Sequence, residues 1–337
     1  SIGSALPEVL FLVAGFTLPT LLGSTGIEYE KQRYLIIAGV CVVIGAVMYG
    51  NSYFHINERV IPPAKERKPG EPSALKRIFT CKPLMLVVLS GMLSFGRYML
   101  QAAAPHVARY SGFYIGKTAP QTVDEINSNI STVALVIQVC AAVGMFGAMV
   151  FLPKLYKKFE YKHIMIVSCI GGFIASCFTL LIGWTTKNLL LCIPFMLISA
   201  IPLGVINNVS FAMVCDCLDF MEWKTGFRNT GLGSACQSFV NKIGNAFATV
   251  MIIVMYVIVN IDVSKLNVGS GDAVVQAVNS MSSTQNFAMF SLVSIVPGVS
   301  MLLCAIPMFF YKIDDIKPQI QKELAEKRKT SGVKIEN

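Results

Sequence analysis

The chain has 337 residues, of which 54% are hydrophobic and only 14% are charged, and its mean hydropathy is +0.61. Soluble domains usually carry about a quarter of charged residues, so this composition argues against a soluble protein. The formal net charge is +9, but the basic residues gather in alternate connections between apolar runs, which argues against a nucleic-acid partner.

Apolar runs of about twenty residues, the length that a helix needs to cross a bilayer, recur along the chain. Eight such runs cover residues 5–24, 33–54, 83–108, 130–152, 163–184, 188–214, 231–260 and 286–311. They predict an all-α, polytopic membrane protein built as a helical bundle. The first run follows Ser1 directly, without an initiating Met or a basic leader, so we expect that four earlier helices are missing.

Lys and Arg are frequent in some connections between the runs and rare in the others. They concentrate in residues 59–82, 154–162, 224–228 and 312–334. Because positive charge accumulates on the cytoplasmic side of membrane proteins, we expect a multi-pass protein of the cell membrane with both termini in the cytoplasm.

The longest basic connection, NERVIPPAKERKPGEPSALKR, is rich in proline and charge and predicts a flexible linker. In a transporter made of two joined halves, the six runs after this linker form one complete half. We therefore expect four parts: residues 1–56 as the last two helices of an N-terminal bundle, 57–82 as a cytoplasmic linker, 83–311 as a six-helix C-terminal bundle, and 312–337 as a cytoplasmic tail with a short helix.

The seventh run contains polar residues at spacings of three and four, which places them near one helical face. They are Ser234, Gln237, Asn241, Lys242, Asn245 and Thr249. A lysine at the centre of a membrane helix costs about 2.5–3.5 kcal/mol, so we expect this face to line a cavity. The alternative is a tight helix–helix contact near Gly244, which explains the asparagines but not the ammonium group.

The third run carries a second intramembrane charge, Arg97, with Gln101 one turn later. A guanidinium inside a membrane needs acceptors, and no Asp or Glu lies centrally in the eight runs. The partner is expected to be a substrate, an amide such as Asn207, or a carboxylate outside this chain. Pro105 predicts a kink, and His106 is interpreted as a histidine at the membrane interface.

The sixth run contains Pro202 and Gly204 just before the adjacent amides Asn207 and Asn208. A helix loosened beside polar side chains is one way to build a binding site midway across the membrane. Gln138 in the fourth run is a further candidate, or a simple bridge between two helices.

The run VCDCLDFMEWKTGFRNTGLGS follows the sixth span. Its charged residues are Asp216, Asp219, Glu222, Lys224 and Arg228, and the three acids share one face of a short helix. Cys215 and Cys217 have no Cys or His partners nearby, and nothing arranges the acids as a cage for a hard cation, so we expect no metal site.

The pattern D-x-x-D-x-x-E-x-K-T-G-x-R, followed by a helix with NKIGNAF, resembles the glycoside–pentoside–hexuronide:cation symporter family, the melibiose permease-like branch of the major facilitator superfamily. The resemblance extends loosely to AGFTLP in the first run and PP-x-x-E in the linker. It implies a twelve-helix transporter, not an enzyme. Such a transporter moves a sugar or glycoside together with Na⁺, H⁺ or Li⁺ by alternating access and has no other cofactor.

The resemblance implies that Lys242, with Asn245, couples the cation to the sugar by pairing with acids of the first half, and that the charged run lies at the cytoplasmic gate. The residues expected to bind substrate are Arg97, Gln101, Gln138, Asn207, Asn208, Gln237 and Asn241. A tryptophan that faces the sugar within the family aligns with Asn207, which puts sugar stacking of that kind in doubt. The family's cation carboxylates lie in early helices that this chain lacks.

A second hypothesis is a transport-inactive scaffold or sensor derived from a transporter. A membrane enzyme is not favoured, because the runs lack a His/Asp/Glu cluster or a nucleophile–base set. The expected partners are a sugar or glycoside and the lipid bilayer, with the protein as a monomer.

Overall fold

The computed structural model describes residues 27–55, 79–113, 122–226, 230–261, 275–276 and 278–330. The first predicted run, most of the predicted linker and Arg228 lie outside these residues. The chain divides into two compact units, Ser1–Pro72 and Ser73–Asn337, which we describe separately. The boundary falls within the predicted linker.

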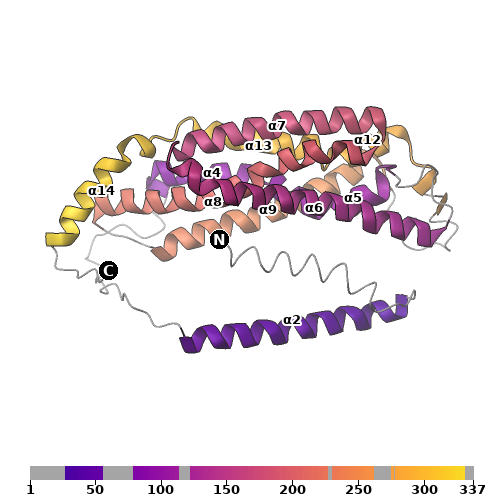
Figure 1. Ribbon diagram of the computed structural model, residues 1–337, viewed down its shortest axis with the longest axis horizontal. Coiled ribbons are helices and arrows are strands. Elements are labelled where there is room, and N and C mark those ends of the chain that lie inside the picture. Colours follow the sequence, from indigo (N-terminus) through magenta and orange to yellow (C-terminus); the bar gives the residue numbers. More distant parts are fainter. Residues whose placement is uncertain are drawn as a thin grey trace. The chain divides into compact units, whose positions relative to one another are not determined.

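In the first unit, the described element is helix α2, Ile27–His55, which covers the predicted second run (Figure 1). It contains a shorter apolar stretch, Ala38–Asn51.

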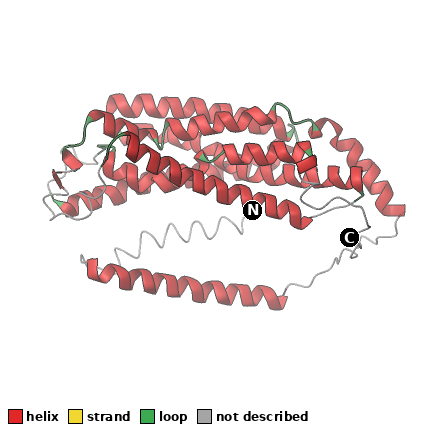
Figure 2. Cartoon of the chain, turned by 180° about the vertical axis from the view of Figure 1, so that it is seen from behind, coloured by secondary structure: helices red, strands yellow, loops and turns green. Residues whose placement is uncertain are grey.

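The second unit is a bundle of helices, and its described residues contain no strand (Figure 2). Its helices are α4 (Lys82–Leu93), α5 (Gly96–Tyr110), α6 (Val123–Tyr156), α7 (Tyr161–Thr186), α8 (Leu189–Thr225), α9 (Thr230–Ile258), α12 (Ser283–Ser291), α13 (Ile295–Met308) and α14 (Ile313–Thr330). Six segments are long and apolar enough to cross a membrane: α6, α7, α8, α9, and the pairs α4–α5 and α12–α13. The all-α membrane fold and the six runs predicted from residue 83 onward are therefore confirmed.

Capping residues define several helix ends. At the start of α6, the Thr122 hydroxyl accepts a hydrogen bond from the Glu125 backbone amide. At the start of α8, the Asn188 side-chain oxygen accepts one from the Leu190 backbone amide. Helix α8 ends at Gly226, whose φ of +72° is a left-handed conformation that glycine adopts without steric cost.

Small residues set the close packing of α6, α7 and α8. A Cβ on Gly204 would lie 2.4 Å from the Met145 carbonyl oxygen of α6, and one on Gly172 of α7 would lie 2.4 Å from the Pro202 ring. Inside a membrane the hydrophobic effect does not drive helices together, and small residues allow their backbones to approach closely enough for van der Waals packing. Pro202 and Gly204 therefore serve packing: α8 continues without interruption through both, and the loosened helix predicted there is wrong.

The break occurs instead between α4 and α5, at Ser94 and Phe95, whereas Pro105 lies inside α5. Ser300 of α13 bridges the break. Its hydroxyl accepts a hydrogen bond from the Gly96 amide at 2.8 Å and donates one to the Leu93 carbonyl at 2.6 Å. The backbone amide and carbonyl that lose their helical hydrogen bonds at the break are thus bonded by a side chain of a neighbouring helix. In a membrane interior such groups need a partner within the protein.

Helix α9 packs through a narrow row of mostly small residues. The buried positions are Gly233, Cys236, Val240, Gly244, Ala248 and Ile252, whereas the large side chains of Phe239, Phe247 and Val250 are exposed. Gly244 lies against the Tyr98 ring, which leaves no room for a side chain. The row of small residues brings α9 close to α4 and α5, so α9 packs through this row and not through its bulky apolar side chains.

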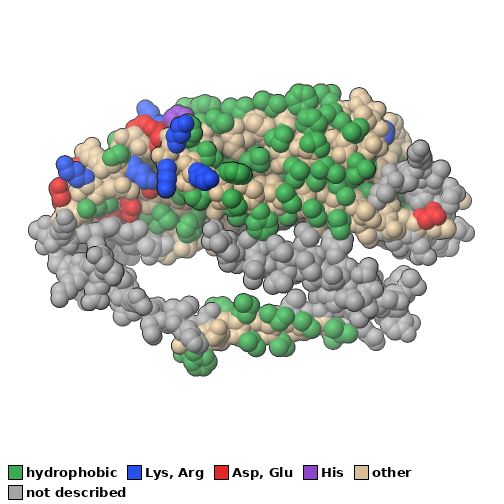
Figure 3. Space-filling view, in the orientation of Figure 1, with side chains coloured by type: hydrophobic (Ala, Val, Ile, Leu, Met, Phe, Trp, Pro, Cys, Tyr) green, Lys and Arg blue, Asp and Glu red, His purple; other side chains and the backbone are tan. Residues whose placement is uncertain are grey.

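Charged side chains visible in Figure 3 gather mainly near the end of the bundle where α14 lies, and hydrophobic side chains cover much of its length. We call this the basic end and define it by Lys82, Lys162, Lys312 and Lys317. These lysines lie near one another because α7, α8, α14 and the start of α4 contact one another there. Large apolar side chains remain exposed along the helices, for example Phe211 and Val167. Such a surface suits contact with lipid.

Candidate functional site

Arg97 is the centre of a buried polar cluster formed by three helices. Its side chain on α5 is 3% exposed. Nη1 donates to the Asn207 side-chain oxygen on α8 at 2.6 Å, and Nη2 donates to that of Asn241 on α9 at 2.9 Å. The guanidinium also lies against the Tyr98 ring, 4.6 Å from its centroid. Two predicted binding amides are therefore joined directly to the predicted intramembrane charge.

The break between α4 and α5 positions this arginine. Arg97 is the second residue of α5, and its amide bonds to the Ser94 carbonyl at 3.2 Å across the interruption. A helix that starts anew at Gly96 directs the side chain into the bundle.

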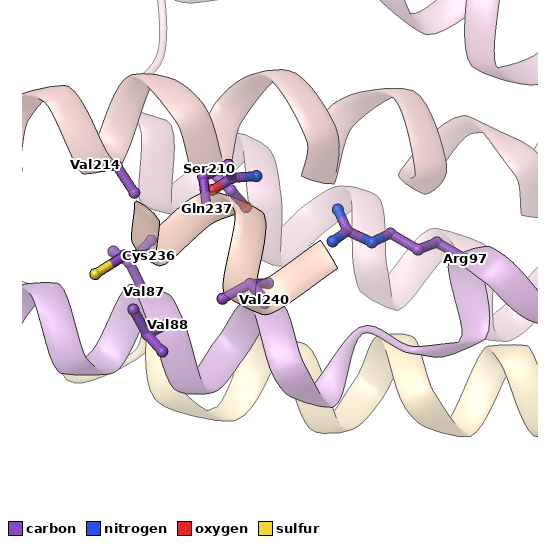
Figure 4. Close-up of a pocket in the computed structure, with 9 residues that line it drawn as sticks. Val87, Val88, Arg97, Ser210, Val214, Cys236, Gln237 and Val240 are labelled. Atoms are coloured by element: carbon purple, nitrogen blue, oxygen red, sulfur yellow. The ribbon is translucent and has the colours of Figure 1, made fainter. Parts of the chain in front are cut away.

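A narrow pocket, too closely packed to hold a water molecule, adjoins the cluster. Residues of α4, α5, α8 and α9 line it, and the Arg97 side chain points toward Ser210, Gln237 and Val240 (Figure 4). The remaining lining residues are valines, Cys236 and Gly91, so Arg97, Ser210 and Gln237 are the polar side chains of an otherwise apolar pocket.

The charge of Arg97 is only partly compensated. Within the described residues its partners are neutral amides, and its Nε has no hydrogen-bond partner. Hydrogen bonds from a charged donor are about twice as strong as neutral ones, but they do not replace a counter-charge. The arrangement can accept a further oxygen-rich or anionic group.

The other residues predicted to bind substrate are less closely connected to the cluster. Gln237 shares the pocket with Arg97, whereas Gln101 on α5 is exposed and Gln138 on α6 is half-buried. The side-chain amide of Asn208 donates to the Gly204 carbonyl of its own helix at 2.8 Å. These positions stay predictions.

Lys242 and Asn245 lie on the exposed side of α9. The side-chain amide of Asn245 donates to the backbone carbonyl of Asn241 at 3.1 Å, so a residue predicted for coupling contacts one predicted for substrate binding on the same helix. Within the second unit, Lys242 is thus outside the Arg97 pocket although its neighbour Asn241 belongs to the cluster. Its coupling role stays a prediction.

At the basic end, the predicted gate is joined to α14. The Lys317 ammonium donates to Asp216 at 2.8 Å, and the Trp223 indole donates to Glu323 at 2.6 Å. Asp219 lines a small pocket beside the first pair. The remaining gate residues are Glu222, half-buried near the end of α8, and Lys224, which is exposed with its ammonium 5.6 Å from the Phe220 ring.

A second set of contacts connects α14 to the start of α7. The Lys162 amide donates to Asp314 at 2.9 Å, and its ammonium contacts Asp315 at 2.8 Å. Burial raises the pKa of Asp314, an effect that this hydrogen bond only partly offsets, whereas the Lys162 ammonium lowers the pKa of Asp315. Burial is the largest single effect on the pKa of Lys317 and would lower it, but the hydrogen bond to Asp216, the charge of Asp216 and the contact with Tyr161 together raise that pKa.

The sequence predicts a cytoplasmic tail with a short helix over residues 312–337, whereas the structure packs that helix, α14, against the bundle. Ile320 and Leu324 of α14 are buried against the bundle, as is Ile313. Their spacing of seven and four residues marks one face of an amphipathic helix and could have identified the docking surface. Among the described residues, no group of three or more His, Cys, Asp or Glu side chains could hold a metal ion.

The described residues of the second unit thus form a polytopic helical membrane protein with an arginine–amide cluster between its helices. The chain belongs to the MFS/sugar transport protein family, whose profile matches residues 1–315. The family comprises transporters rather than enzymes.

Curated relatives are distant. An uncharacterized symporter, YjmB, of Bacillus subtilis is 24% identical over 71% of this chain and 48% of the relative. A putative sulfoquinovose importer of Salmonella typhimurium is 22% identical over 89% of this chain and 57% of the relative. A putative 2,3-dihydroxypropane-1-sulfonate exporter of Escherichia coli is 21% identical over 69% of this chain and 49% of the relative. The chain spans about half the length of the curated relatives it matches.

Proposed function

We propose that the protein is a secondary active transporter that moves a sugar or glycoside across the cell membrane by alternating access, in symport with Na⁺, H⁺ or Li⁺. The observation that carries the proposal is the buried Arg97 guanidinium held by Asn207 and Asn241. Because these groups come from three different helices, a relative movement of the helices would assemble or disperse the site. Family membership and relatives named as a symporter and an importer support the same reading.

In this proposal, Arg97, Asn207 and Asn241 bind substrate oxygens directly, and Gln237 extends the site along the pocket. Gln101, Gln138 and Asn208 contribute in other conformations of the cycle. We extend the proposal to a substrate with an acidic group, because a guanidinium fork matches carboxylate and sulfonate oxygens and Arg97 has no anionic partner among the described residues. One relative is named as an exporter of a sulfonate.

Lys242 and Asn245 are proposed to couple substrate to the cation by facing acidic groups on the other side of the transport path. The exposed position of Lys242 on α9 supports this role, because an ammonium inside the membrane needs a partner. Asp216, Asp219, Glu222, Lys224 and Arg228 are proposed to form the cytoplasmic gate. The uneven distribution of Lys and Arg supports cytoplasmic termini, and we propose a monomer.

The test is uptake by cells producing the full-length protein that contains this chain, with a panel of neutral glycosides, hexuronates and sulfonated sugars, measured with and without a Na⁺ or proton gradient. We expect uptake of at least one acidic sugar. Arg97→Ala should reduce it by about 100-fold or more, because the site loses its only described cation and leaves two amides without their partner. Arg97→Lys should also be impaired, since an ammonium cannot reach both amides with a planar fork.

Thr185→Ala is the control, because this exposed hydroxyl donates only to carbonyls of its own helix α7, and it should retain most of the uptake. Unchanged uptake in Arg97→Ala would refute the site. If the unaltered protein transports no member of the panel under any gradient, the scaffold or sensor hypothesis is favoured instead.

A further inference from the structure

An apolar groove of about 640 Å³ lies at the basic end, away from the Arg97 cluster. Its walls come from the start of α4, from Phe220 near the end of α8, and from the junction of α13 and α14. Several wall residues are large and solvent-accessible: Phe79 is 68% exposed, Phe310 67% and Leu89 47%. None of these residues takes part in the proposed transport site.

Two lysines, Lys82 and Lys312, also line the groove, and both are exposed. Lys82 is the first residue of α4, and Lys312 directly precedes α14. The N-terminus of a helix carries a partial positive charge, so a lysine there is unfavourable unless an anion lies nearby. The groove thus combines an apolar wall with two cationic side chains and two helix N-termini.

The acidic residues of this region are engaged elsewhere. Asp314 accepts the amide of Lys162, and Asp315 pairs with the Lys162 ammonium, although Asp315 also feels the charge of Lys312. A further cation, Lys224, lies 5.6 Å from the Phe220 ring that forms part of the wall. The balance of charge around the groove is therefore positive.

We propose that this groove binds an anionic phospholipid, with its phosphate between Lys82 and Lys312 and an acyl chain along the apolar wall. In the groove, the apolar side chains of α4 and of the α13–α14 junction meet Lys82 and Lys312, and such a boundary between apolar and charged surface is the level at which a lipid phosphate lies in a bilayer. Basic pockets between membrane helices on the cytoplasmic side suit anionic headgroups. A free phosphate would leave the aromatic wall uncovered, and a zwitterionic lipid would leave the lysines uncompensated.

The two tryptophans provide a local readout. The Trp223 ring lies 6.0 Å from that of Phe220 in the groove wall, whereas Trp184 is near the opposite end of the bundle, at the end of α7. In a Trp184→Phe background, fluorescence reports Trp223 alone. The protein is reconstituted in phosphatidylcholine vesicles with increasing fractions of brominated phosphatidylglycerol or brominated phosphatidylcholine, because bromine quenches a nearby indole.

We expect brominated phosphatidylglycerol to quench Trp223 at lower mole fractions than brominated phosphatidylcholine. Lys82→Gln/Lys312→Gln should reduce this preference by about fivefold for each lysine, following the attraction of a lysine to an anionic surface. Lys82→Arg/Lys312→Arg should keep it. Lys157→Gln/Lys158→Gln, which removes the same charge at the end of α6 from two exposed positions, should keep it as well.

Equal quenching by the two lipids would overturn the proposal, as would a preference that survives Lys82→Gln/Lys312→Gln. If millimolar inorganic phosphate abolishes the preference, the site binds free phosphate and not lipid, and the proposal also fails. The helical circular dichroism of each variant is measured in parallel. If the glutamine variant does not fold, the comparison rests on Lys82→Arg/Lys312→Gln and its reciprocal, each of which should lose about half of the logarithmic preference.

Discussion

At the scale of single residues, Arg97 connects the sequence, the fold and the proposed function. An arginine that is 3% exposed and bonded only to neutral amides among the described residues is costly to bury. A structural role alone would be served more cheaply by apolar packing of similar volume. The incomplete compensation of its charge is what a substrate oxygen would relieve.

Asn207→Asp tests this interpretation. The new carboxylate would stand 2.6 Å from Nη1 of Arg97, form an ion pair and compete with an acidic substrate. We expect affinity for the best acidic sugar of the uptake panel to fall at least about tenfold, with an unchanged or raised thermal midpoint. Calorimetric binding and thermal unfolding in detergent measure both. Asn188→Asp is the control, because it adds the same charge at the exposed start of α8, where its oxygen can still accept from the Leu190 amide. Normal affinity in Asn207→Asp would contradict the proposed role.

At the scale of elements, the interruption between α4 and α5 is the feature that directs Arg97 inward. It depends on Ser300, whose hydroxyl serves both the Gly96 amide and the Leu93 carbonyl. No pattern within residues 83–108 could reveal a partner two hundred positions away on α13. The proline at position 105, which is the obvious local signal, lies inside an intact helix.

Ser300→Ala should therefore destabilise the protein by about 1–3 kcal/mol, because it leaves two backbone groups buried without partners. We expect a lower thermal unfolding midpoint and weaker substrate binding together, since the start of α5 would shift. Ser291→Ala is the control: that hydroxyl donates only to Ala288 within its own helix. An effect of Ser300→Ala no larger than that of Ser291→Ala would show that the bridge is dispensable.

At the scale of the whole molecule, α14 ties the ends of distant helices together at the basic end. Lys317 reaches Asp216 on α8, while Asp314 and Asp315 contact Lys162 at the start of α7. The side chains of Lys317 and Asp216 are 26% and 11% exposed, so solvent only partly screens their attraction. The terminal helix therefore belongs to the packed bundle.

A double-mutant cycle measures this connection. Asp216→Asn and Lys317→Gln should each lower the free energy of unfolding by about 1–3 kcal/mol, and the double variant should lose less than the sum. The readout is thermal or denaturant unfolding in detergent. Lys322→Gln, at an exposed lysine further along α14, should be close to neutral. Strictly additive effects would mean that the pair contributes nothing.

The sequence by itself determined the all-α membrane class, the six described spans and the polar residues worth considering. The length of an apolar segment and the charge of the connections beside it can be read locally, and they suffice to predict which segments cross a bilayer as helices. It also marked Arg97 and Asn207 as possible partners. Only the tertiary structure decided which helix breaks, which face of α9 packs, and that α14 docks. Those outcomes depend on contacts between residues far apart in the chain, such as Ser300 with Gly96 and Gly204 with Met145, which hydrophobic periodicity cannot encode.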